Sequence, residues 1–247
     1  CSYNLQSVPL LCVLAASAAK IQIAYTGEPD KIIEEVSTRN IGSTENITLN
    51  TPPVEYSLSP GNVQPYSEYN LTISAEGFEK TVISGVELLE GVLSIQNIQL
   101  KPFTNQPDTD RVVIGPHTLY GDYPPKIAEA EVKPVNETGE IVLSRVVVPE
   151  YIIVHDGPPS DSSAKNYYVK YKDYIKNVAS SEIYATWPIE AIRANILAIM
   201  SFTLNRVYTE WYRNKGYDFT ITSSTAYDHK WIKDRNIFDT ISTVTDE

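Results

Sequence analysis

Residues 171–194, YKDYIKNVASSEIYATWPIEAIRA, decide the fold of the second half of this 247-residue chain. Apolar side chains recur there at helical spacing, namely Tyr171, Tyr174, Ile175, Val178 and Ile183. The spacing predicts a helix over about 172–184. Pro188 interrupts that helix, and a proline is favoured as the first residue of a new one. The second helix is predicted to run to about Asn214 and to end at Gly216, because glycine readily adopts the left-handed conformation of a helix cap.

Residues 20–100 carry a strand pattern instead. Polar and apolar side chains alternate over 20–25, 69–74 and 92–100, so each segment has one buried and one solvated face. Glycine, proline, asparagine and aspartate separate these segments at short intervals, as turns do. We therefore predict an α+β protein, in which an N-terminal antiparallel β-sandwich is followed by a mixed helical and β domain.

The other segments are harder to classify. Residues 8–19 form an apolar run of the length of a signal-peptide core, too short to span a bilayer, but no methionine or basic segment precedes it. We therefore expect 1–19 to be a processed or leader-like segment and the chain to be a processed product or a fragment. Residues 106–165 are rich in proline, which breaks regular elements, and are predicted to form an ordered connector with short strands at 146–148 and 151–154.

Charge and cysteine content exclude several classes of function. The formal net charge is −11, which repels nucleic acid and anionic membrane surfaces, so we expect neither as a partner. The two cysteines, Cys1 and Cys12, form no Cys-x-x-Cys pair, and the three histidines are scattered. We therefore predict no metal site and no cofactor.

Two parts of the sequence resemble known families. Residues 66–80 and 92–102 resemble transthyretin-like or carboxypeptidase-regulatory-like modules, which implies such a module over 20–105. The second half resembles the core motif of the stage II sporulation D/LytB family of peptidoglycan hydrolases, which implies a catalytic domain over 166–247. The residues that carry this second resemblance are 174–178 (YIKNV), 181–183 (SEI), 187–188 (WP), 190–194 (EAIRA), 217–219 (YDF) and 224–225 (ST).

The second resemblance implies a lytic transglycosylase whose catalytic residue is Glu182. In this chemistry a glutamic acid protonates the glycosidic oxygen between N-acetylmuramic acid and N-acetylglucosamine, and a 1,6-anhydro ring then closes without water. We expect the substrate to be spore cortex peptidoglycan cleaved during germination. The enzyme would be kept as a precursor, activated by a protease and located in the cortex or coat region, outside the cytoplasm.

Glu182 also suits an acid on physical grounds. It lies between a helix and the Trp187-Pro188 break, next to Tyr184, where apolar walls would raise its pKa. A lone glutamate is more often a solvated surface charge, so the surrounding motif carries the assignment. The predicted substrate-binding residues are Tyr184, Trp187, Ser201, Ser224, Thr225 and Asp228. Helix packing explains Ser201 equally well, and a ligand role for His229 is doubtful. Some family members bind zinc in this loop, but serine and threonine stand here instead.

The family's domain normally continues into a Gly-rich segment, which does not occur before Glu247, so we expect the catalytic domain to be incomplete. Two alternatives to an enzyme stay open. One is a non-catalytic module that binds peptidoglycan in the spore wall. The other is an adhesin-like spacer in which the predicted β-sandwich dominates function.

Overall fold

The computed structural model describes residues 6–14, 18–40, 42–104, 109–117, 119, 124–126 and 142–247. Cys1 and parts of the predicted Pro-rich connector, namely 106–108, 118, 120–123 and 127–141, lie outside these residues. The chain divides into two compact units. The β-unit comprises 1–117, 184–188 and 233–243, and the helical unit comprises 118–183, 189–232 and 244–247. The predicted ranges 20–105, 106–165 and 166–247 follow sequence texture alone and stay predictions.

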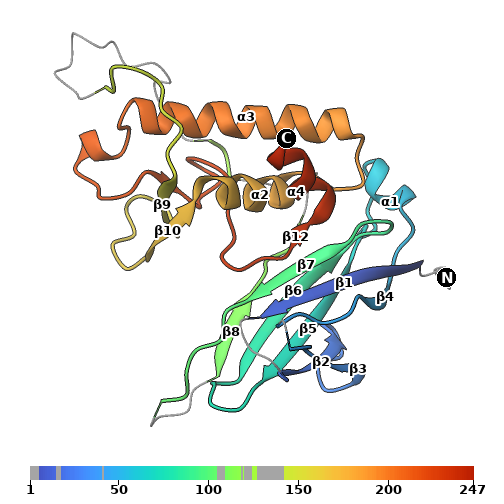
Figure 1. The fold of residues 1–247 in the computed structure, drawn as a ribbon. Coiled ribbons are helices and arrows are strands. Elements are labelled where there is room, and N and C mark those ends of the chain that lie inside the picture. The colour runs from blue at the N-terminus through green and yellow to red at the C-terminus, as the bar shows by residue number, and fades with distance from the viewer. Residues whose placement is uncertain are drawn as a thin grey trace. The chain divides into compact units, whose positions relative to one another are not determined.

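The β-unit contains two sheets and one short helix (Figure 1). The first sheet has the order β12-β7-β1-β4 and the second the order β3-β2-β5-β6-β8. The elements are β1 (Gln6–Leu14), β2 (Lys20–Tyr25), β3 (Ile32–Ser37), β4 (Ile47–Thr51), α1 (Glu55–Leu58), β5 (Ser67–Ser74), β6 (Thr81–Leu88), β7 (Ser94–Ile98), β8 (Asp110–Val113) and β12 (Ile237–Phe238).

The predicted alternation of buried and exposed residues is present in these strands. In β4, the side chains of Ile47, Leu49 and Thr51 are buried and those between them are exposed. The two sheets are joined by hydrogen bonds, because Tyr69 on β5 donates to the carbonyl of Asn50 and Thr51 donates to the carbonyl of Leu88. The buried faces of both sheets thus form a common core.

The α+β class is confirmed, but the sheets are mixed rather than purely antiparallel. β1 pairs in parallel with β7, and β6 pairs in parallel with β8. The apolar segment that we predicted to be leader-like supplies β1 over residues 6–14. β1 lies between β4 and β7 in the sheet, and its Leu10 and Cys12 side chains are fully buried. Buried strands often have a continuous apolar sequence, which is the pattern of this segment.

Residues from the end of the chain complete the β-unit. The Arg235 guanidinium donates to Oε2 of Glu87 at 2.9 Å, and Nδ1 of His117 lies 3.0 Å from the same oxygen. All three side chains are inaccessible to solvent. Burial alone would raise the pKa of Glu87, but the charges of Arg235 and His117 outweigh it and lower that pKa. The amide of Asn236 adds a hydrogen bond to the carbonyl of Glu87.

The helical unit contains a small sheet and the two predicted helices, which pack against each other (Figure 1). The sheet has the order β10-β9-β11. No helix in the described part of the chain is long and apolar enough to cross a membrane. The elements are β9 (Tyr151–His155), β10 (Asn166–Lys170), α2 (Tyr171–Glu182), α3 (Ile189–Tyr208), the 3₁₀ helix η1 (Arg213–Lys215) and β11 (Ile221–Thr222), and α4 (Asp239–Asp246) spans the division between the units.

Three predictions for this half were wrong in extent. The second helix ends at Tyr208 rather than near Asn214, because Glu210 has a positive φ of 45° that no α-helix accommodates. Gly216, with φ of 84°, instead closes η1. The predicted strand over 217–222 shrinks to β11. Residues 146–148 form no strand and are exposed, because a strand needs a pairing partner as well as β-branched side chains.

Candidate active site

Helix α2 places Glu182 at its C-terminal end. Its buried face includes Tyr174, Ile175 and Val178, which fixes the rotation of the helix about its axis. The helix ends because Ile183 is extended, with φ of −144° and ψ of 145°. Glu182 is therefore the last helical residue, held by a well-packed helix rather than by a mobile loop.

Hydrogen bonds from several residues join the loop after β11 to α2. Asn177 on α2 donates to the carbonyl of Ile232 at 2.7 Å, and its Oδ1 accepts from the N–H of Ile232 at 3.0 Å. One turn and a half further along, Oε1 of Glu182 accepts from the backbone N–H of Lys230 at 3.1 Å. These bonds hold residues 230–232 of the loop against the C-terminal half of α2.

The environment of Glu182 favours its neutral form. The side chain is partly buried, and loss of water raises the pKa of its carboxyl above the ordinary value. The N–H of Lys230 and the charges of Lys126 and Lys230 oppose this effect without cancelling it. A carboxyl group with a raised pKa retains its proton closer to neutral pH, as a general acid requires.

Glu182 lines a pocket of about 310 Å³ within the helical unit. This volume is at the lower end of the range for small-molecule sites, about 300–1,000 Å³. Of the predicted site residues, Glu182, Thr225 and Asp228 line it together. The complete lining is Leu119, Pro124, Lys126, Ser181, Glu182, Asn195, Thr225, Asp228 and Lys230.

The carboxylate of Asp228 is engaged within the protein. Its Oδ1 accepts from Nε of Arg206 at 2.8 Å, and its Oδ2 accepts from the hydroxyl of Tyr212 at 2.7 Å. Oδ2 also accepts from the backbone N–H and the hydroxyl of Thr222. Because the side chains of Asp228 and Arg206 are 0% and 5% exposed, Asp228 organises the loop that carries Thr225 and Lys230.

His229 is neutral in this environment. Burial, followed by the positive charges of Lys126 and Arg206, lowers its pKa to about 3. Its Nδ1 lies 3.0 Å from the hydroxyl of Tyr174, which is fully buried on α2. We therefore interpret His229 as a packing residue between α2 and the loop. Among the described residues, no three His, Cys, Asp or Glu side chains are grouped so as to hold a metal ion.

The other predicted binding residues have different surroundings. Tyr184 and Trp187 belong to the β-unit, where Tyr184 donates to the carbonyl of His117 at 3.1 Å and Trp187 to that of Ser57 at 2.7 Å. Ser201 is exposed on α3 and donates to the carbonyl of Leu197. Ser224 does not line the pocket, and its carbonyl accepts two backbone N–H groups that turn the loop.

Among the polar residues that line the pocket, sequence reasoning did not assign Lys126, Ser181, Asn195 or Lys230 to the site. Lys126 lies in the predicted connector, and Lys230 lies in the loop after β11. Neither lysine is part of a recognisable sequence motif. Asn195 on α3 was missed as well, and its Oδ1 is a buried acceptor that has no hydrogen-bond partner in the described part of the chain. The only signal for Asn195 was its position on α3 three residues, about one turn, after the buried Ile192.

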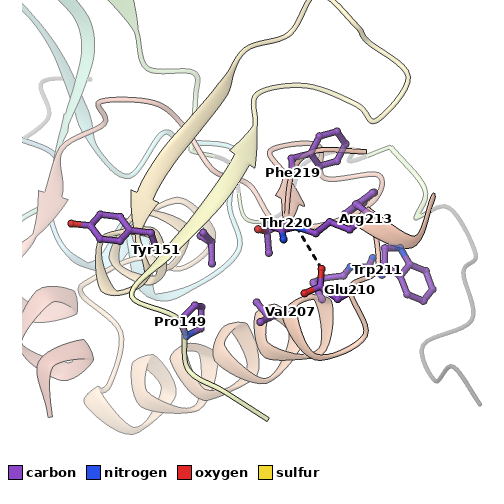
Figure 2. Close-up of a pocket in the computed structure, with 11 residues that line it drawn as sticks. Pro149, Tyr151, Val207, Glu210, Trp211, Arg213, Phe219 and Thr220 are labelled. Carbon is purple, nitrogen blue, oxygen red and sulfur yellow. Dashed lines mark ion pairs between the residues drawn. The ribbon is translucent and has the colours of Figure 1, made fainter. Parts of the chain in front are cut away.

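A second, smaller hollow of about 110 Å³ lies between the start of β9 and the end of α3 (Figure 2). Pro149 and Tyr151 lie on one side of it, and Val207 and Glu210 on the other. The Glu210 carboxylate pairs with Arg213 at 3.5 Å. None of the site residues predicted from the sequence lines this hollow. The pocket at Glu182 is therefore the candidate active site.

Comparison with known proteins gives one informative match. No curated protein matches the chain at a significant level. Two solved catechol 1,2-dioxygenases share 16% and 10% identity, cover 45% and 44% of this chain and have TM-scores of 0.28 and 0.26, too low for an argument. They come from Acinetobacter sp. ADP1, inhibited by bound mercury, and from Acinetobacter radioresistens, as a mutant. The chain spans 59% and 58% of their lengths.

The family comparison concerns the segment that carries the candidate site. Residues 161–244 match the family model SpoIID, described as a stage II sporulation protein. The match includes α2 with Glu182, α3, and the loop with Lys230. The resemblance inferred from the 171–194 motif is therefore confirmed at the level of this domain. Residues 161–244 are thus similar to the SpoIID family.

Proposed function

We propose that this protein is a lytic transglycosylase that cleaves the bond between N-acetylmuramic acid and N-acetylglucosamine in peptidoglycan, with Glu182 as the general acid and base. The observation that carries the proposal is the position of Glu182, a partly buried acid with a raised pKa on the wall of a pocket. The SpoIID family is associated with cell-wall lytic activity, which supports the reaction class.

The reaction needs one carboxyl group in two protonation states. The neutral acid of Glu182 gives its proton to the glycosidic oxygen, and the bond from that oxygen to C1 of the muramoyl residue breaks. The resulting carboxylate then takes the proton of the C6 hydroxyl as O6 bonds to C1 and closes the 1,6-anhydro ring. The acid is regenerated, no water is consumed, and no second carboxylate is needed.

The environment of Glu182 fits both states. Burial favours the proton-bearing form at the start. The N–H of Lys230 and the positive charges of Lys126 and Lys230 stabilise the carboxylate that forms midway. A pKa raised by one effect and moderated by others suits a group that must release and recover a proton in one turnover.

The biological setting is part of the same proposal. We place the activity on spore cortex peptidoglycan during germination, outside the cytoplasm, in a precursor activated by a protease. The support is the SpoIID-type domain together with a β-rich N-terminal region that resembles a transthyretin-like module, a pairing similar to that in spore cortex-lytic enzymes of clostridia.

The test is digestion of purified spore cortex by the full chain, with products identified by mass spectrometry. The wild-type protein is expected to release 1,6-anhydro muropeptides, and Glu182→Gln is expected to release at least a hundredfold less, the loss typical of removing a general acid. Glu190→Gln is the matched control, because Glu190 is an exposed glutamate that pairs with Arg193. Unchanged cortex with wild-type protein that still co-sediments with it would instead support the non-catalytic binding module.

A further inference from the structure

Asn195 is a polar residue in an apolar row on α3. Ile192 lies three residues before it and Ile199 four residues after it, so all three share one side of the helix. The two isoleucine side chains are 0% and 2% exposed, and α3 packs against α2 in the interior of the helical unit. A residue between two buried isoleucines is ordinarily apolar, so the asparagine needs a separate explanation.

Packing alone does not account for the side-chain amide of Asn195. Its Oδ1 is buried and has no hydrogen-bond partner in the part of the chain that the structure describes. An acceptor that loses its hydrogen bonds to water and gains none in the protein destabilises the fold. Leucine has a similar size and would fill the same position without this cost. The amide group is therefore better explained by a ligand that it binds.

Asn195 lines the pocket that also holds Glu182. The residue is half-buried and its Oδ1 is inaccessible to solvent, so in this orientation a ligand in the pocket meets the amide nitrogen rather than the oxygen. The χ2 torsion of asparagine is broad and roughly two-fold, and a half-turn about it exchanges the two atoms. The carboxamide can therefore donate a hydrogen bond to a ligand or accept one from it. Leu119 and Pro124 add apolar surface to the same lining.

The chemistry of the proposed substrate narrows the choice of ligand group. Within a peptidoglycan strand, O1 and O4 of the muramoyl ring are in glycosidic bonds, O3 carries the lactyl ether and O6 is the hydroxyl that closes the anhydro ring. The remaining polar substituent is the 2-acetamido group, on the carbon next to the C1 atom whose bond breaks. It has one donor, one acceptor and a methyl group, which match the carboxamide of Asn195 and the apolar side chains of Leu119 and Pro124.

We propose that Asn195 is a substrate-binding residue that forms a hydrogen bond with the 2-acetamido group of the muramoyl sugar and so holds C1 near Glu182. This inference rests on the proposed function, because it names the substrate group that the same pocket recognises. Strands whose muramoyl residues carry a free amine at C2 lose the acetyl carbonyl and the methyl group, so they are expected to bind more weakly.

The experiment compares three soluble glycan strands with the full chain. One is fully acetylated, one is de-N-acetylated on muramic acid only, and one on glucosamine only. Asn195→Leu keeps the volume of the side chain and removes the amide. It is expected to raise KM about fivefold for the two strands that keep the muramoyl acetyl group, the effect of one neutral hydrogen bond, and to leave KM unchanged for the third. Asn195→Gln keeps a carboxamide and is expected to retain the preference.

The matched control is Asn205→Leu, because Asn205 is a second asparagine on α3 and does not line the pocket at Glu182. This variant is expected to show the same ratio of KM values between strands as the wild type. Because each ratio compares strands on one variant, a partial loss of folded protein lowers the rate without changing the ratio. Binding is measured in parallel by calorimetry with Glu182→Gln, alone and combined with Asn195→Leu, so the preference is read even without turnover.

The outcomes separate this inference from the proposed function. Absence of cleavage of all three strands contradicts the proposed function, while tighter binding of strands acetylated on muramic acid, lost with Asn195→Leu, still supports the role of Asn195. An equal rise of KM for all three strands in Asn195→Leu overturns that role and leaves the proposed function intact, because Asn195 would then contact another group or act in packing. A preference that follows the glucosamine acetyl group overturns it as well.

Discussion

The backbone N–H of Lys230 donates to Oε1 of Glu182 at 3.1 Å, so the loop after β11 orients the acid at the end of α2. This contact fixes the carboxyl group without forcing it to ionise. Two or three backbone donors to one carboxylate can lower its pKa strongly, whereas burial outweighs the single donor here and the pKa of Glu182 stays raised. Orientation and protonation are thus set by different neighbours, which allows each to be changed separately.

The first prediction concerns the pH dependence of cleavage. A general acid must be protonated, so kcat/KM is expected to fall as pH rises through the raised pKa of Glu182. Lys126→Met removes a charge that lowers this pKa, so the alkaline limb of the profile is expected to move to higher pH. The profile is measured by release of reducing or anhydro ends between pH 4 and 9.

Lys172→Met serves as the control for this pH profile, because Lys172 is 63% exposed and pairs with Asp246. Its alkaline limb should coincide with that of the wild type. A limb that moves to lower pH in Lys126→Met would show that the lysine charge does not stabilise the Glu182 carboxylate.

The second prediction concerns stability and needs no substrate. A group whose pKa is higher in the folded than in the unfolded chain contributes stability below its unfolded pKa and loses it as pH rises through its folded pKa. Glu182 is such a group, and Glu182→Gln keeps an oxygen for the N–H of Lys230. The Tm of the variant relative to the wild type is therefore expected to increase from pH 4 to pH 8, by about 2 °C.

Calorimetry or circular dichroism at several pH values measures this difference. Glu190→Gln should show no such trend, because Glu190 is an exposed residue on the first turn of α3. A Tm difference for Glu182→Gln that stays constant or shrinks with rising pH would mean that burial does not disfavour the ionised form of Glu182.

The third prediction concerns the loop that carries Lys230. Asp228→Asn removes the charge that neutralises Arg206, whose side chain is 5% exposed. Leaving a buried cation unpaired is expected to lower the free energy of unfolding by roughly 3–5 kcal/mol and to abolish cleavage, because Thr225 and Lys230 lose their support. Urea unfolding and cortex digestion measure the two effects.

Arg193→Gln is the matched disruption of an exposed ion pair. Arg193 donates to Glu190 at 2.5 Å and to Glu247 at 2.6 Å with its side chain 38% exposed, so its loss should change stability little. Equal destabilisation by both substitutions would show that the Asp228–Arg206 pair has no special role.

Local sequence pattern predicted the positions of the helices and strands better than it predicted which strands pair with each other. The 3.6-residue spacing located α2 and the start of α3 within one or two residues, and alternation located β2, β5 and β7. These features depend on near neighbours in sequence. The parallel pairing of β1 with β7 and of β6 with β8 depends instead on strands far apart in the chain, which periodicity does not encode.

The candidate site shows the same limit. Glu182 was found because it stands in a compact motif, and Thr225 because it follows in the same family pattern, whereas Asp228 was a candidate from the loop after that pattern. Lys126 lies far upstream among prolines and reaches the site only through the tertiary fold. The ion pair between Arg235 and Glu87 joins residues 148 positions apart, and no local signal marks either of them.

The last prediction tests the strand pairing that sequence did not reveal. Gly85 on β6 has φ of 85°, and a Cβ atom there would lie 2.4 Å from the carbonyl oxygen of Ile114, just after β8. Gly77 has nearly the same φ, 82°, but a Cβ atom there would meet nothing within 4 Å. Both substitutions to alanine strain the backbone, by about 1 kcal/mol, but only Gly85→Ala also forces β8 away from β6. Thermal unfolding should therefore show a clearly larger loss for Gly85→Ala, accompanied by faster amide exchange in 110–113, whereas equal losses would contradict the parallel pairing of these strands.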